Sequence, residues 1–401
     1  MKFHGLLGAA LAVTPVLGSP YSNRLFTRQD SGECQIKLPP TNGGRKVAIV
    51  LDSSGSMDFN DPNNLRITAG KSLNKQLVTG SGATGNLESD LVTVVDFDDE
   101  ARVIYPLGDP AGADGVFDSI DSSGGTWIAD GVDKALSELT KPGNDPTADR
   151  SGILVLTDGE DFDTDGLIQQ IESAGSAGVR VSFGFLAPSE SFFEPDLLTA
   201  ILRTGGTYTS FATAEAVQSF LFLVLSNGLT AADHSVATGQ VLLPGVTVAK
   251  LSGAGQPVSF TYAAQAAEQL VFTFESLSSQ GLEGELKDAS GNALASNSTA
   301  GTDPASISYT ADSAGNLQFE VKTSDPAEGV FQVSLNSSLG LAGCNLTTTP
   351  PPTNSTNGTI PSGTPTPTPT STIPPIVTAG AARIATAGAP LVGLLLALVA
   401  L

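Results

Sequence analysis

The chain has 401 residues, and its 19 Lys and Arg residues against 41 Asp and Glu residues give a formal net charge of −22 at pH 7. This length accommodates two domains with further segments at the ends. An acidic surface repels phosphate backbones, so the composition excludes nucleic acid as a partner and is compatible with divalent cations.

The N-terminus predicts a secretory signal peptide over residues 1–18. Lys2 precedes a short apolar stretch that ends in small residues, with cleavage expected after Gly18 or Ser19. The alternative, a buried N-terminal helix, is disfavoured by two interrupting prolines. Residues 19–43 are then an N-terminal segment that leads into the first domain.

Residues 44–228 alternate continuous apolar runs with helical patterns. Strands are expected over residues 47–51, 90–97, 101–108, 153–157, 180–186 and 206–211, and helices over residues 65–78, 127–139, 166–175, 195–202 and 214–226. This order predicts an α/β fold with a doubly wound, mostly parallel sheet that helices cover on both faces.

Residues 229–340 change to a period of two, which predicts a small antiparallel β-sandwich. In QLVFTFES one face carries Leu270, Phe272 and Phe274, and NLQFEVKT alternates in the same way. In pattern and length this domain resembles the pre-peptidase C-terminal type. The pattern favours a spacer role over glycan binding, because no aromatic binding platform is visible.

A dense group of small oxygen-bearing side chains follows the first strand of the α/β domain, in IVLDSSGSMD. Because ligands bind at the carboxyl ends of strands in such sheets, residues that follow other strands should converge there. Two carboxylates and three hydroxyls suit a hard cation, Mg²⁺ or Mn²⁺, with Ca²⁺ as the alternative. The expected metal ligands are Asp52, Ser54, Ser56, Thr126 and Asp158.

The three parts of this motif, DxSxS, GGT and LTDG in that order, resemble the metal-ion-dependent adhesion site of von Willebrand factor type A domains. The similarity covers about residues 44–228, and LTDGED is typical of the calcium-activated chloride channel regulator type. The resemblance implies a binding module in which the five residues hold the cation. Proteins of the channel-regulator type also carry a zinc-protease domain. The resemblance does not imply this activity here, because the chain has no HExxH motif.

Nucleophilic catalysis has little support in the sequence. The only histidines are His4, within the signal peptide, and His234, beyond the α/β domain, and there is no G-x-S-x-G elbow. We therefore expect a protein that is not an enzyme. A metal-assisted hydrolase that uses the same ion remains the contrasting hypothesis.

A second acidic stretch directly follows the LTDG motif. It satisfies the D-x-D-x-D-G-x5-E calcium-loop pattern with Asp161, Asp163, Asp165 and Glu172. A strand rather than a helix precedes it, so the other interpretation is an acidic helix N-terminus that interacts favourably with the helix dipole. Ca²⁺ binding at this loop and an acidic helix N-terminus are the two alternatives that the sequence offers.

The two cysteines of the chain, Cys34 and Cys344, predict one disulfide that joins the ends of the ectodomain. Sequons for N-glycosylation occur only in the rear half of the chain. They lie at Asn297, Asn336, Asn345, Asn354 and Asn357.

The C-terminal part has the composition of a stalk and an anchor signal. Residues 341–378 are rich in Ser, Thr and Pro and predict an extended, glycosylated stalk. Residues 379–401 combine small residues, a spacer and an apolar tail too short to span a bilayer, which is typical of a GPI-attachment signal that is removed. Gly380 is the expected attachment residue, with Ala379 as the alternative.

These features together predict a glycoprotein on the extracellular face of the plasma membrane or in the cell wall, attached to the membrane only through a lipid. Its expected role is metal-dependent recognition of an extracellular protein or an acidic polymer. A structural cell-wall component with a vestigial metal site is a further alternative. Trp127, which directly follows Thr126, is expected either to contact a partner at the rim of the site or to pack against a neighbouring loop.

Overall fold

The computed structural model describes residues 26–28, 34–38, 41–144, 146–159, 161–186, 194–233, 240–253, 255–323, 325, 327–341 and 344–348. All of them belong to one of the two compact units into which the chain divides, the unit that ends at Thr353. The predicted signal peptide, anchor signal and most of the stalk lie outside the described residues, as do His234, Asn354, Asn357 and Gly380.

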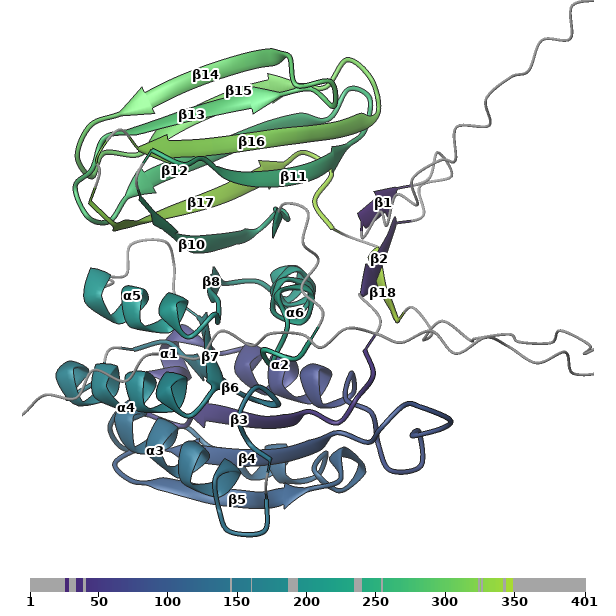
Figure 1. Ribbon diagram of the computed structural model, residues 1–401, viewed down its shortest axis with the longest axis vertical. Helices are drawn as coiled ribbons and strands as arrows, with labels where there is room; N and C mark the ends of the chain where they lie inside the picture. Colours follow the sequence, from purple (N-terminus) through teal and green to yellow (C-terminus); the bar gives the residue numbers. More distant parts are fainter. Residues whose placement is uncertain are drawn as a thin grey trace, which may run out of the picture. The chain divides into compact units, whose positions relative to one another are not determined.

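A parallel sheet forms the centre of the α/β region, as predicted (Figure 1). Its buried runs of Val, Ile and Leu favour strands that are covered on both faces. One further strand pairs antiparallel at the outer edge. In spatial order these strands are β8 (Tyr208–Phe211), β7 (Val179–Phe185), β6 (Ser151–Thr157), β3 (Lys46–Asp52), β4 (Leu91–Phe97) and the antiparallel β5 (Ala101–Gly108).

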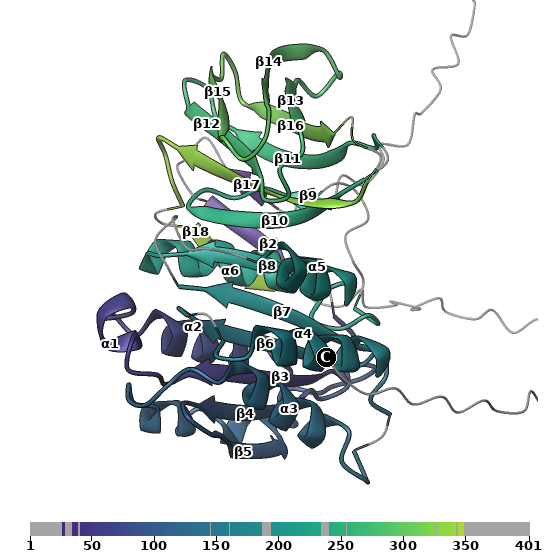
Figure 2. The same ribbon diagram turned by 90° about the vertical axis from the view of Figure 1, so that its left-hand side faces the viewer.

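Helices cover both faces of this sheet, which confirms the doubly wound α/β fold (Figure 2). Two separate cores result, one on each face. On one face lie α1 (Met57–Asn60), α2 (Leu65–Asn74) and α6 (Ala214–Asn227), with two short 3-10 turns, η1 (Pro110–Gly112) and η2 (Val116–Ser119). On the other face lie α3 (Ile128–Leu139), α4 (Thr164–Ser176) and α5 (Pro195–Arg203).

The sheet continues past β8 into the predicted β-sandwich. β8 pairs antiparallel with β10 (Val246–Ser252), with Val246 opposite Phe211. Three more antiparallel strands follow, β17 (Gly329–Ser337), β12 (Gln269–Ser276) and β15 (Ala305–Thr310), so that one sheet has ten strands. The α/β region and the sandwich therefore share main-chain hydrogen bonds.

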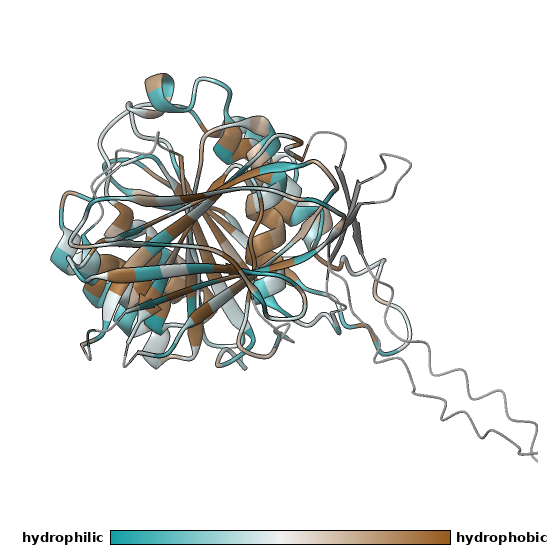
Figure 3. Cartoon of the chain, turned by 90° about the horizontal axis from the view of Figure 1, so that it is seen from above, coloured by the Kyte–Doolittle hydropathy of each residue, from teal (hydrophilic) through white to brown (hydrophobic). Residues whose placement is uncertain are grey.

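A second sheet, of five strands, packs against the sandwich part of the first. Its strands in spatial order are β14 (Ala293–Thr299), β13 (Leu282–Lys287), β16 (Gly315–Thr323), β11 (Val258–Ala264) and β9 (Gln240–Val241). Between the sheets, the Phe319 ring lies 5.1 Å from that of Phe272 and 5.8 Å from that of Phe274, centroid to centroid. Apolar residues accordingly occupy the interior and polar residues the outer loops (Figure 3).

A small three-stranded sheet contains both cysteines. β1 (Phe26–Arg28) and β18 (Cys344–Thr348) flank β2 (Cys34–Leu38), and Cys34 is the register partner of Cys344 in the parallel pair. The backbone thus brings together the two positions for which a disulfide is predicted. Among the helices in the described part of the chain, none is long and apolar enough to cross a membrane.

Candidate metal centre

The DxSxS and LTDG motifs meet at one edge of the sheet. β3 and β6 are parallel neighbours with Leu51 opposite Leu156, so both strands end at the same edge. Asp52 is the last residue of β3, and Asp158 directly follows β6. The parallel register therefore brings two carboxylates from distant parts of the sequence to neighbouring strand ends.

Hydrogen bonds join these residues into a continuous polar cluster. The hydroxyls of Ser54 and Ser56 lie 3.0 Å apart, and the Ser56 hydroxyl donates to Asp158 Oδ1 at 3.0 Å. Asp52 Oδ1 accepts the Ser54 N–H at 2.8 Å, and Asp52 Oδ2 accepts the Thr157 hydroxyl at 2.5 Å. Four of the five predicted ligands are thus in one hydrogen-bonded chain.

Thr126, the fifth predicted ligand, lies beside the same cluster. A Cβ on Gly159, the residue after Asp158, would stand 3.7 Å from Thr126 Oγ1. The loop that carries Thr126 is fixed on both sides: the Gly55 N–H donates to Gly124 O at 3.1 Å, and the Phe162 N–H donates to Thr126 O at 3.3 Å. The structure therefore brings all five predicted ligands to one edge of the sheet.

The electrostatics of this cluster are unusual because its carboxylates have no cationic partner. Asp52 is fully buried, and burial raises the pKa of its carboxyl to about 6 despite the hydrogen bonds from Ser54 and Thr157; the charge of Asp158 adds to the rise. Asp158 is also buried, and its Oδ2 has no hydrogen-bond partner. Among the described residues no ion pair involves either carboxylate.

A buried carboxylate oxygen without a partner is costly unless something outside the chain satisfies it. The donor set contains carboxylate and hydroxyl oxygens, with neither His nor Cys, and such a set suits a hard divalent cation. Asp52, Ser54, Ser56, Thr126 and Asp158 therefore fit the requirements of a Mg²⁺ or Mn²⁺ site.

The comparison with protein families agrees with this geometry. Residues 47–160 match the family description "von Willebrand factor type A domain". The α/β region has the type A fold. The match includes all five predicted ligands and extends from the first strand to the end of the LTDG motif.

Several individual proteins are similar to this chain. Calcium-activated chloride channel regulator 1 of Equus caballus is 30% identical over 203 residues, which are 48% of this chain and 20% of the relative, so the chain spans about a fifth of that protein's length. An aerotolerance-related membrane protein from Bacteroides fragilis is 22% identical, with 45% of this chain and 96% of that chain covered and a TM-score of 0.35. Proximal thread matrix protein 1 from the mussel byssus, with a zinc-occupied MIDAS motif, is 20% identical, with 45% and 46% covered and a TM-score of 0.36.

The second acidic stretch of the α/β region has the geometry of a helix N-terminus. α4 begins at Thr164, so most of the twelve residues of the predicted calcium loop are helical. Asp161 Oδ2 accepts the Ala129 N–H at 2.5 Å and its Oδ1 accepts the Asp163 N–H at 2.6 Å, while Asp163 accepts the Gly166 N–H as the cap of α4.

These contacts leave the acidic side chains without a common centre. Asp165 and Glu172 are exposed on α4, and no group of three or more His, Cys, Asp or Glu side chains within the described residues is placed to hold a metal. Burial raises the pKa of the Asp161 carboxyl, although the amide hydrogen bonds that it accepts lower it. The structure thus favours the helix-capping interpretation over the calcium loop, because backbone amides already occupy the first two carboxylates.

Thr157 is a site residue that the sequence patterns did not single out. Its hydroxyl contacts Asp52 and also accepts the Gly159 N–H at 3.2 Å. It therefore fixes the orientation of the buried carboxylate and the start of the loop after β6. Its position directly before Asp158 in LTDG was the available signal.

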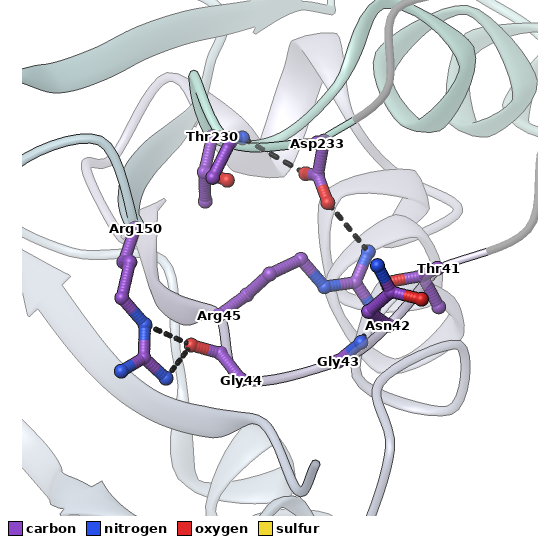
Figure 4. Close-up of a pocket in the computed structure, with 9 residues that line it drawn as sticks. Thr41, Asn42, Gly43, Gly44, Arg45, Arg150, Thr230 and Asp233 are labelled. Carbon is purple, nitrogen blue, oxygen red and sulfur yellow. Dashed lines mark hydrogen bonds and ion pairs between the residues drawn. The ribbon is translucent and has the colours of Figure 1, made fainter. Parts of the chain in front are cut away.

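The opposite edge of the same sheet contains a pocket of about 160 Å³ (Figure 4). Arg45, which precedes β3, donates from Nε and Nη2 to the two carboxylate oxygens of Asp90 at 3.1 and 2.7 Å. Arg150, which precedes β6, donates from Nε to Gly44 O at 2.7 Å. The pocket lining is Thr41, Asn42, Gly43, Gly44, Arg45, Arg150, Thr230, Ala232 and Asp233.

Arg45 and Arg150 at this second edge therefore have partners within the chain. Figure 4 also shows Arg45 Nη1 facing Asp233, 3.9 Å from its Oδ1. These contacts tie together the starts of β3, β4 and β6. We assign this edge a structural role, in contrast to the edge with the unpaired carboxylates.

Proposed function

We propose that the type A domain is a divalent-metal-dependent binding module that recognises an extracellular partner. The observation that carries this proposal is the buried Oδ2 of Asp158, which has no hydrogen-bond partner. The neighbouring Asp52 carboxylate also has no cation near it. Evolved proteins rarely leave such an atom unsatisfied unless a ligand completes it. Asp52, Ser54, Ser56, Thr126 and Asp158 would hold Mg²⁺ or Mn²⁺.

Bound Mg²⁺ would supply a positive charge with coordination positions open to an oxygen ligand. The protein contributes few charged ligands there, namely the two carboxylates, and its serine and threonine hydroxyls are neutral. A carboxylate of the partner would therefore be attracted to the site once the cation is in place. Thr157 and the Ser54 N–H hold the Asp52 carboxylate in a fixed orientation for this purpose.

We further propose that the protein acts outside the cell as a lipid-anchored glycoprotein, with GPI attachment at Gly380. The exposed positions of Asn297 and Asn336 on the sandwich support glycosylation there. The register pairing of Cys34 with Cys344 supports the disulfide. Release from cells by a phosphatidylinositol-specific phospholipase would test the anchor, and thiol titration of the unfolded protein before and after reduction would test the disulfide.

The single tryptophan of the chain gives a direct test of the metal-binding function. Trp127 directly follows Thr126, so its emission should change when Mg²⁺ enters the site. Adding acetate to the Mg²⁺-loaded protein should change the emission again, whereas acetamide should not. Asp52→Ala should abolish both responses, and equal responses in this variant would contradict the proposal.

The same preparation distinguishes the alternative classes of function. Turnover of a panel of esters and phosphate esters that EDTA abolishes would indicate a metal-assisted hydrolase. Emission that is indifferent to Mg²⁺, together with extraction from cell walls that is unaffected by chelators, would indicate a structural component.

A further inference from the structure

Large exposed apolar side chains concentrate around the five predicted metal ligands, at the edge of the sheet where β3 and β6 end. We call this edge of the type A domain the metal edge. Phe59, Trp127 and Phe162 are 84%, 43% and 75% exposed. Each follows a predicted metal ligand within a few residues: Ser56, Thr126 and Asp158 respectively. Of the described residues, only two other large apolar side chains are similarly exposed, Leu294 and Leu339, and both belong to the sandwich region. We call Phe59, Trp127 and Phe162 the aromatic rim.

The fold fixes the backbone at each position of the aromatic rim. Phe59 lies in α1, where its N–H donates to Ser56 O at 3.0 Å and the neighbouring Met57 is fully buried. The Trp127 N–H donates to Asp98 O at 3.0 Å directly before α3. With 43% of its surface exposed, Trp127 is accessible to a partner, while the rest of the residue is covered by the protein.

Phe162 lies against the loop that carries Thr126. Its N–H donates to Thr126 O at 3.3 Å, and a Cβ on Gly125 would stand 2.6 Å from its ring carbon Cε2. Glycine at position 125 therefore leaves the space that the Phe162 ring occupies. The ring is held beside the metal edge while most of its surface remains in water, which is the arrangement of an anchor for a partner.

The surface around the aromatic rim is acidic. Asp58, Asp99 and Glu100 are exposed near the two motif loops, and Asp163 is exposed next to Phe162. Arg102 on the same side of the domain is already paired, at 3.1 Å from Asp96 and 2.6 Å from Asp98. A bound cation would attract one carboxylate of a partner. Any further carboxylates of the partner would lie near these exposed acidic side chains and be repelled by them.

We propose that the partner is a polypeptide segment with a single Asp or Glu side chain, flanked by apolar or aromatic residues and by Lys or Arg. This inference rests on the proposed function, since the carboxylate would meet the metal. The flanking apolar groups would pack on Phe59, Trp127 and Phe162, and the flanking cations would face Asp58, Asp99, Glu100 and Asp163. A polymer with an acid group on every unit would be repelled by the same carboxylates, so charge complementarity favours the protein over the acidic polymer.

The test selects ligands from a displayed heptapeptide library with Glu fixed at the centre, against the full chain in Mg²⁺. We expect aromatic, aliphatic, Lys and Arg residues to be enriched beside the Glu. A selected peptide should bind at least about tenfold more weakly to the triple variant Phe59→Ser, Trp127→Ser, Phe162→Ser. Leu294→Ser, which removes an exposed apolar side chain from the sandwich, should bind like the wild type.

Two readouts separate this inference from the function on which it rests. The triple variant should keep the calorimetric heat of Mg²⁺ binding, and Asp52→Ala should lose both the heat and the peptide. Enrichment of acidic flanks, tighter binding of polygalacturonate than of any peptide, or peptide binding unchanged in the triple variant would overturn the inference and leave the metal site intact. Equal binding of peptides with central Glu and Gln would overturn both, and no enrichment over an Asp52→Ala selection would overturn the inference.

Discussion

The two ends of β3 carry buried charges of opposite sign that the fold treats differently. Arg45, directly before the strand, pairs with Asp90 through both carboxylate oxygens, and its own N–H also donates to Asp90 at 2.9 Å. Asp52, the last residue of the strand, has only neutral donors around it and a second carboxylate, Asp158, nearby. The seven-residue strand thus separates a buried charge that has an ion-pair partner from a buried carboxylate that has none.

The difference is visible in the protonation equilibria. Burial lowers the pKa of the Arg45 guanidinium, but the hydrogen bonds and charge of Asp90 outweigh it and the pKa is raised. Burial raises the pKa of Asp52 to about 6, and no cation opposes it. The charge of Arg45 is neutralised within the chain, whereas the two adjacent carboxylates of Asp52 and Asp158 have no cation near them and would be neutralised by a cation from outside the chain.

The largest change in the free energy of unfolding should come from removing the ion pair between Arg45 and Asp90 at the start of β3. Asp90→Ala would leave Arg45 buried without its partner and should lower the free energy of unfolding by about 3–5 kcal/mol. Urea denaturation measures this loss. Glu88→Ala, which removes an exposed partner of Arg150 at 3.4 Å, is the matched control and should cost at most about 1 kcal/mol. Equal losses in the two variants would contradict the distinction between the two ends.

Removing a charge at the unpaired end of β3 should change the free energy of unfolding far less. Asp158→Asn removes a buried charge that has no cationic partner, so the metal-stripped variant should unfold within about 1 kcal/mol of the wild type. Mg²⁺ at a hundred times its Kd should stabilise the wild type by about 2.7 kcal/mol and leave Asp158→Asn unchanged. Thermal unfolding with and without EDTA measures both differences, and an Asp158→Asn protein that Mg²⁺ still stabilises would refute the assignment.

Lys250 extends the comparison to the sandwich, because its charge is buried and no ion pair among the described residues involves it. Burial lowers the pKa of its ammonium group to about 8. Between this value and 10.5 the unfolded chain binds more protons than the folded one, so stability rises with pH across that window. Lys250→Met should therefore stabilise the protein by about 1–3 kcal/mol at pH 7, and the gain should shrink towards pH 10. A pH-independent gain in urea denaturation would show that packing, not charge, is responsible.

The smallest effect should come from an exposed pair. Arg203 of α5 lies 2.5 Å from Glu328, and the two side chains are 64% and 46% exposed. Water and salt screen such a pair, so Arg203→Ala should change the free energy of unfolding by less than about 1 kcal/mol. A loss as large as that of Asp90→Ala in the same urea series would show that burial is not what separates strong from weak pairs here.

Much of the α/β fold could be predicted because its signals are local. The apolar runs at residues 47–51 and 153–157 lie within β3 and β6, and the expected helix over residues 127–139 corresponds to α3. The helix expected over residues 65–78 ends earlier, at Asn74, where the buried Asn74 amide donates to Pro110 O and Asp114 Oδ1. These tertiary partners are invisible in the helical pattern.

Pairings between distant segments were beyond the sequence patterns. Neither the continuation of the sheet from β8 to β10 nor the pairing of β2 with β18 has a local signal, because each depends on where the intervening chain returns. At the edge of the sheet where β3 and β6 end, the convergence of the five predicted ligands could be expected from their spacing and from the resemblance. The contact of Thr157 with Asp52 and the exposure of Phe59 and Phe162 required the structure.

The most direct test of the metal site is calorimetric titration of Mg²⁺ into EDTA-stripped protein. Asp158→Asn and Asp163→Asn would be measured beside the wild type, because the second acid lies near the site but caps α4. We predict one binding event per chain in the wild type and in Asp163→Asn, and none in Asp158→Asn. Equal heats in Asp158→Asn and the wild type, or no heat in any of the three, would contradict the metal site at the end of β3.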